Sequence, residues 1–121
     1  MKLEDLTIYE MSIDISNKIW NEVIKWDSFP KNTIGWQLVR AADSIVANIS
    51  EAFGRYHFKE QKQFLYYARG SLYETKTFIR MSNSRHLINN ETHSLLKNEL
   101  ESLARKLNSF INTVGKMSTD Q

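Results

Sequence analysis

The apolar residues near the carboxyl end of this sequence recur at alternating steps of four and three, and this spacing constrains the fold most strongly. The series consists of Leu96, Leu100, Leu103, Leu107, Phe110 and Val114. Residues three or four positions apart lie on the same side of an α-helix. The series therefore predicts a helix whose apolar seam packs against other helices, as in a coiled coil.

Three earlier segments show the same helical periodicity. Their apolar stripes are Ile8, Met11, Ile15, Ile19, Val23 and Trp26, widened by Ile13, Trp20 and Ile24; Leu38, Ala41, Ala42, Ile45, Ile49, Ala52 and Phe53; and Phe64, Leu65, Ala68, Leu72 and Ile79. No stretch alternates as a strand would. We therefore predict helices over about 8–26, 35–53, 59–81 and 92–114, in one all-α domain over residues 1–121 with an up-down-up-down four-helix bundle.

The expected breaks between these helices coincide with residues that disfavour a helix interior. Pro30 lacks a backbone N–H, so we expect the first helix to end before it. Gly54 and Gly115 can adopt the left-handed conformation of a helix cap. The polar run from Ser82 to Arg85 and the pair of asparagines at 89–90 predict the remaining break.

Composition narrows the class of protein. Hydrophobic residues make up 41% and charged residues 25%, which is typical of a globular domain. The sequence contains no cysteine, which excludes disulfides, thiolate nucleophiles and cysteine metal sites. It shows neither a signal peptide nor an apolar run long enough to cross a membrane. We therefore expect a cytoplasmic protein without a membrane partner.

The sequence offers little for catalysis. His57, His86 and His93 do not form an HExxH pair, and no glycine-rich phosphate loop or nucleophile elbow is present. The carboxylates of Asp43, Glu51 and Glu74 lie in helical segments near arginines, where ion pairing is the ordinary interpretation; a catalytic carboxylate pair is the alternative. We predict a protein that is not an enzyme and has no metal site or cofactor.

The distribution of charge is more informative than the net charge of +2. Residues 1–30 carry three bases and six acids, whereas residues 31–89 carry nine bases and four acids. Within the third helical segment, seven cationic or tyrosine residues share one face: Lys59, Lys62, Tyr66, Arg69, Tyr73, Lys76 and Arg80. Phosphates attract such a stripe and bases stack on tyrosine, so it is a candidate nucleic-acid site. Alternatively, Glu60, Glu74 or the acids of the first helix neutralise it.

A second polar stripe follows the second helical segment. It consists of Gln37, Arg40, Ser44, Asn48, Glu51 and Arg55, and Glu74 of the third segment joins the set as a candidate partner. Short amide and hydroxyl groups can satisfy one another inside a contact, where unpaired polar groups are costly. We predict a polar network between helices or between subunits; a solvated face is the alternative.

Gly70 stands in the middle of the third segment, where glycine costs roughly 1 kcal/mol relative to alanine. Ala68 and Ser71 make a patch of small residues with it. Close packing of another helix is the interpretation we favour.

Two runs carry a family resemblance. The first extends from Gln37 to Glu51 and is followed by Gly54 and Arg55; the second extends from Phe64 to Glu74. Together they resemble the bacterial four-helix-bundle family first noticed as reading frames in intervening sequences of 23S rRNA genes. The accessory protein of diversity-generating retroelements is similar. The motif residues here are Gln37, Arg40, Ala41, Ala42, Ser44, Asn48, Glu51, Gly54, Arg55, Ala68, Arg69, Gly70, Ser71 and Glu74.

The resemblance implies a four-helix protomer, a ring-shaped homopentamer and no established enzymatic activity. In the retroelement branch it also implies binding to nucleic acid and to a reverse transcriptase. Ala52 stands where the family often has glycine, and Phe53 is a bulky residue near the same helix end. Arg69 belongs to the motif, so a structural pairing with a carboxylate such as Glu51 is an alternative to a role in binding.

Two functional hypotheses follow. The first is a non-catalytic oligomeric bundle that binds RNA or DNA weakly and without sequence preference. The second is a protein-interaction scaffold without a nucleic-acid role. Large apolar residues, including Trp20, Trp26 and Trp36, exceed what one small bundle is expected to hide, which favours an oligomer in both cases.

Overall fold

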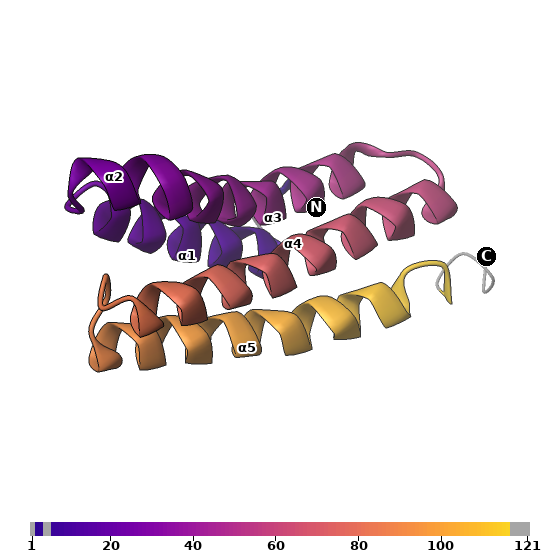
Figure 1. Ribbon diagram of the computed structural model, residues 1–121. Helices are drawn as coiled ribbons and strands as arrows, with labels where there is room; N and C mark the ends of the chain where they lie inside the picture. Colours follow the sequence, from indigo (N-terminus) through magenta and orange to yellow (C-terminus); the bar gives the residue numbers. More distant parts are fainter. Residues whose placement is uncertain (1, 4–5, 117–121) are drawn as a thin grey trace.

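The computed structural model describes residues 2–3 and 6–116, and its regular secondary structure over that part is entirely helical (Figure 1). Four long helices form the fold: α1 (Thr7–Val23), α3 (Trp36–Gly54), α4 (Phe58–Ser84) and α5 (Asn90–Thr113). A short α2 (Ser28–Pro30) and a π-helical stretch, η2 (Lys31–Gly35), lead from α1 into α3. The predicted all-helical fold with four main helices is confirmed.

The four long helices lie side by side with short connections, so that each one runs opposite to the helix before it (Figure 1). α3 packs against α1 and, most extensively, against α4; α5 packs against α4 and α1. The α4–α5 face and the α1–α3 face are therefore on opposite sides of the bundle. No helix of the part described is long and apolar enough to cross a membrane.

The core consists largely of the predicted stripes. On α5 the buried seam is Leu96, Leu100, Leu103, Leu107 and Ile111. Ile111 takes the position that the sequence pattern gave to Phe110, which is only half-buried. An α-helix has 3.6 residues per turn, so a stripe drifts and a step of four after Leu107 restores its alignment with the core.

Thr75 completes the apolar side of α4, where the sequence pattern left a gap between Leu72 and Ile79. Its side chain is fully buried, and its hydroxyl donates to the backbone oxygen of Ser71 at 2.7 Å. This bond satisfies the hydroxyl within the helix, so threonine can occupy a core position at little cost.

The first helix ends before Pro30, as expected, but Pro30 is not what ends it and itself lies in helical backbone. α1 already ends at Val23, and helical backbone begins again at Ser28. Pro30 lies in the first turn of that new helical stretch with φ −63° and ψ −35°. The first-turn N–H groups of a helix have no partner within it, so proline loses nothing there and its fixed φ suits the helix.

Gly35 allows the chain to fold tightly back on α1. A Cβ added at this position would lie 2.7 Å from Cγ1 of Val23 and 3.3 Å from Cε3 of Trp26. Because both neighbours are buried, there is no room for a side chain. Gly35 thus sets the close approach between the end of α1 and the start of α3.

The helix ends near Ser82 also differ from the predicted ones. α4 continues to Ser84, and the hydroxyls of Ser82 and Ser84 are satisfied within it by donating to the backbone oxygens four residues earlier. The turn that follows holds His86 in the left-handed region (φ 60°). α5 then starts behind Asn89, whose side chain accepts from the backbone N–H of Thr92 at 2.7 Å.

The expected glycine caps divide into two cases. Gly54 is the last residue of α3 and does not adopt a positive φ. Gly115, after α5, has a φ of 88°, as the cap prediction requires.

Polar contacts link α1 to its two neighbours. Ser16 donates to Asp43 of α3 at 2.5 Å. The ammonium of Lys18 donates to Glu99 of α5 and also lies 3.1 Å from Asp14. The hydrogen bond to Glu99, followed by that to Asp14, raises the pKa of Lys18. These contacts join α1 to both of its neighbours in the rotation that the burial of its apolar stripe sets.

Leu103→Ala should lower the free energy of unfolding by roughly 2–5 kcal/mol, because Leu103 is completely buried at the middle of the seam. Urea denaturation followed by circular dichroism measures this. Leu95→Ala is the matched control on the same helix, since that leucine is half exposed. A loss below about 0.5 kcal/mol at Leu103 would contradict the assignment of the seam, because that is the size of a surface substitution.

Candidate nucleic-acid interface

The basic stripe predicted on the third segment lies along α4 on the side that faces α5. The core residues of α4, which include Leu65, Leu72 and Ile79, fix the rotation of the helix. Arg69 then donates to Asn108 of α5 at 3.1 Å, and Lys76 approaches Glu101 of α5 at 4.0 Å. Lys59, Tyr66, Tyr73 and Arg80 are exposed, while Lys62, Arg69 and Lys76 are partly buried. The structure therefore brings all seven stripe residues to one side of α4.

Most of the positive charge in the stripe is not neutralised within the protomer. Among the residues that the structure describes, Lys76 is the only stripe cation with a carboxylate within 4.0 Å. The acids expected to neutralise the stripe are engaged or placed elsewhere: Glu60 lies 3.6 Å from Arg55, and Asp14 of α1 pairs with Lys18. Glu101 of α5, which the sequence pattern does not indicate, is the acid that reaches the stripe.

The two tyrosines of the stripe each carry a cation over the ring. The guanidinium of Arg69 lies 4.9 Å from the ring centre of Tyr66, and the ammonium of Lys76 lies 5.9 Å from that of Tyr73. Each contact is worth about 0.5–1 kcal/mol at an exposed site and restricts both partners. Cations and aromatic rings therefore alternate along the surface, as a surface for phosphates and bases requires.

α5 extends the basic surface with residues that sequence reasoning missed. Lys97 and His93 line a pocket of about 510 Å³ together with Tyr73, Lys76 and Arg80 of α4. Lys97 directly follows Leu96 of the seam, in a position that flanks a coiled-coil core, and His93 lies one turn earlier. The position of Lys97 next to the leucine seam is the sequence signal that could have predicted its place beside α4.

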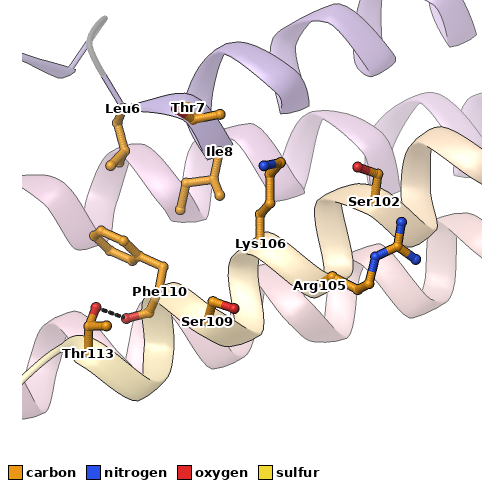
Figure 2. Close-up of a pocket in the computed structure, with 9 residues that line it drawn as sticks. All are labelled: Leu6, Thr7, Ile8, Ser102, Arg105, Lys106, Ser109, Phe110 and Thr113. Carbon is orange, nitrogen blue, oxygen red and sulfur yellow. Dashed lines mark hydrogen bonds between the residues drawn. The ribbon is translucent and has the colours of Figure 1, made fainter.

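Two other cations of α5, Arg105 and Lys106, are exposed and lie at a second hollow. They line a groove of about 750 Å³ between α5 and the start of α1 (Figure 2). Figure 2 shows Lys106 extending from α5 toward α1. The rest of the lining is apolar or carries hydroxyls: Leu6, Thr7, Ile8, Ser102, Ser109, Phe110 and Thr113. This groove is separate from the basic stripe and has fewer cations.

The polar stripe on α3 contributes to a network between α3 and α4 inside the protomer. The hydroxyls of Ser44 and Ser71 are 2.9 Å apart, and Asn48 donates to the backbone oxygen of Ser44 at 2.9 Å and to its hydroxyl at 3.1 Å. Ser71 is the partner that joins the two helices. The middle of the α3 stripe is thus used within one bundle.

The carboxyl-terminal end of the α3 stripe stabilises the connection to α4. Arg55 pairs with Glu51, and its guanidinium lies 4.6 Å from the ring centre of Phe64. Gln61 donates to the backbone oxygen of Arg55 at 2.8 Å. The alternative pairing of Arg69 with Glu51 is wrong, because Arg69 turns to Asn108 on the other side of α4.

The remaining members of the predicted polar set are exposed. Arg40 lies over the ring of Trp36 at 5.6 Å. Gln37 and Glu74 make no side-chain hydrogen bond or ion pair with the described parts of the chain. Glu74 borders an open hollow with Asn48, Gly70 and Ser71. Within residues 2–3 and 6–116, no group of three His, Asp or Glu side chains is placed to hold a metal ion.

Comparisons with known proteins agree with this architecture. A family model described as "23S rRNA-intervening sequence protein" matches residues 4–109. No protein with a curated description matches the chain. The crystal structure of a protein of unknown function from the S23 ribosomal protein family of Bacteroides thetaiotaomicron is similar in fold, with a TM-score of 0.78 and 22% identity. The match covers 86% of this chain and 97% of that one.

Gly70→Ala should raise the stability of the protomer by about 0.5–1 kcal/mol. Contrary to the close packing expected from the sequence, a Cβ at Gly70 would meet nothing within 4 Å. Gly35, by contrast, is tightly enclosed. Urea denaturation of the variant measures the gain. Gly35→Ala is the matched comparison and should destabilise. A loss of stability at Gly70 would show that a neighbouring molecule packs there.

Proposed function

The chain belongs to the family of 23S rRNA-intervening sequence proteins, and we propose that it is a non-catalytic, oligomeric bundle that binds nucleic acid weakly and without sequence preference. The binding surface in this proposal is the α4–α5 face. The residues that carry it in this proposal are Lys59, Lys62, Tyr66, Arg69, Tyr73, Lys76 and Arg80, together with Lys97 of α5, which lines a pocket with Lys76 and Arg80.

The charge balance of the stripe is the observation that supports this proposal. Four of its five cations have no carboxylate within 4.0 Å in the described part of the chain. Like charges three or four residues apart on a helix destabilise it by a few tenths of a kcal/mol per pair. A polyanion relieves this repulsion and gains charge-assisted hydrogen bonds, so binding is favourable at low ionic strength.

The dimensions of the stripe fit a nucleic-acid backbone. From Lys59 to Arg80 it extends 21 residues along α4, or about 32 Å at about 1.5 Å per residue. Successive phosphates of one duplex strand rise about 3.4 Å along the helix axis, so this length spans the axial rise of roughly nine of them. Five cations can contact only some of these phosphates. Because phosphate contacts carry no sequence information directly, recognition is loose.

A protein-interaction scaffold without nucleic acid is the second candidate. It is favoured by the contact between Lys76 and Glu101, which shows how α5 carboxylates can reduce the charge of the stripe. It is also favoured by the exposed apolar side chains near the end of α1 and the start of α3, which are Trp20, Ile24, Phe29 and Trp36. In that case the partner is a protein. The family resemblance implies a nucleic-acid enzyme, such as a reverse transcriptase, as the class of partner.

The protein should behave as an oligomer in solution, with the ring-shaped homopentamer as the proposed state. Trp36, Phe29 and Trp20 are 61%, 79% and 54% exposed, which is costly for a monomer in water, while Trp26 lies in the core. Sedimentation equilibrium of the 14.2 kDa chain at micromolar concentration measures the mass. A stable monomer under these conditions would exclude the ring.

Combined replacement of Lys62, Lys76 and Arg80 by glutamate should abolish binding to a single-stranded or double-stranded oligonucleotide at low salt. These side chains lie on the stripe and are not needed for the core. Fluorescence anisotropy measures the affinity. For the unmodified protein on duplex DNA, a plot of the logarithm of the binding constant against the logarithm of the salt concentration should have a negative slope. The slope should be about −0.9 for each phosphate contacted.

A matched variant controls for net charge. Lys25→Glu, Arg105→Glu and Lys106→Glu change the charge by the same amount at exposed positions that are not part of the stripe. Binding should be weakened far less in this variant, because nearby cations dominate the contact. Circular dichroism verifies that both variants keep their helix content, and sedimentation verifies that both keep their oligomeric state. Equal losses of affinity would reject the stripe as the site, and an unmodified protein that does not bind would favour the scaffold.

A further inference from the structure

The basic stripe ends in a pocket that has the dimensions of a small-molecule site. The pocket lies between the last turns of α4 and the first turns of α5 and has a volume of about 510 Å³. Pockets that hold small ligands and cofactors typically measure about 300–1,000 Å³. The pocket is therefore large enough to take one nucleotide unit.

The lining of the pocket combines cations with an apolar floor and an aromatic wall. Lys76 and Arg80 from α4 and Lys97 from α5 supply positive charge. The floor includes Ile79 and Leu100, which are buried in the core and therefore rigid. Tyr73 is half exposed beside Lys76, so one face of a base can lie on its ring. Two helices are needed to bring these groups together.

We propose that this pocket binds the phosphomonoester of a nucleotide, either free or at the phosphorylated end of a strand. The inference rests on the proposed function, since the pocket is the end of the same basic surface. It assigns a distinct ligand group to Arg80 and Lys97, whereas the rest of the stripe contacts internal phosphodiesters.

The local charge distinguishes a phosphomonoester from an internal phosphate. Three cations line the pocket, and the carboxylate of Glu101 lies 4.0 Å from Lys76, so two positive charges remain without a counter-charge. A phosphomonoester carries about −1.5 to −2 at neutral pH, because its second pKa is about 6. A phosphodiester carries a single negative charge. The monoester therefore balances the pocket, and the guanidinium of Arg80 can bind two of its oxygens.

Isothermal titration calorimetry with adenosine 5′-monophosphate, and with adenosine as the probe that lacks the phosphate, tests the site on the intact protein. The monophosphate should bind and adenosine should not. Arg80→Gln and Lys97→Gln should each weaken binding about tenfold or more, since each removes a charged hydrogen bond. Both side chains are exposed, so the variants should fold, which circular dichroism verifies.

Two matched variants separate the pocket from general electrostatics. Lys62→Gln removes a stripe cation outside the pocket, and Arg105→Gln removes an α5 cation that lines a different hollow. Both should leave the affinity for adenosine 5′-monophosphate within about twofold, because screened charges at that distance contribute little. If Lys62→Gln or Arg105→Gln weakens binding as much as Lys97→Gln, the pocket is not the site and the inference is overturned.

Oligonucleotides with a 5′-phosphate or a 5′-hydroxyl identify the source of the phosphomonoester. A preference for the phosphorylated strand, lost in Lys97→Gln, assigns the pocket to strand ends. Tight binding of the free monophosphate with no such preference assigns it to free nucleotides. If the monophosphate binds no better than adenosine while a longer oligonucleotide still binds, the pocket inference fails and the proposed function stands. If nothing binds, both fail.

Discussion

The burial of the apolar side of α4 between α3 and α5 is the interaction on which the rest of the structure depends. Leu65, Leu72 and Ile79 can reach the core in one rotation of the helix only. That rotation turns Ser71 toward Ser44 of α3 and Arg69 toward α5. Hydrophobic burial therefore decides which polar side chains become internal contacts and which remain a surface, because it contributes far more free energy than any single surface charge.

The two polar stripes of the chain have different fates for a physical reason. The α3 stripe carries short hydroxyl and amide groups near α4, and these can satisfy one another at about 3 Å inside a helix contact. The α4 stripe carries long cationic side chains, whose charged ends stay near water because burying an unpaired charge is costly. The bundle thus uses its neutral polar groups for cohesion and keeps most of its positive charge at the surface.

Sequence reasoning predicted the helices and most of the core but misplaced several details. The predicted seam is wrong at Phe110, because the 3.6-residue turn of the α-helix brings Ile111 into the core instead. Pro30 and Ser82 were misjudged because their effects depend on position: proline is accepted in a first turn, and a serine hydroxyl can bond within its own helix. The candidate stripe on α4 was visible as a face, but its neighbours on α5 were not.

The sequence by itself determined the fold class and the composition of each helix face, since both follow from the 3.6-residue periodicity of local structure. Only the tertiary structure decided which faces meet. It paired Lys76 with Glu101, gave Arg69 to Asn108 and joined Lys97 to Arg80 in one pocket. These contacts connect positions far apart along the chain, and they are set by how the apolar sides of four helices fit together, which no local pattern encodes.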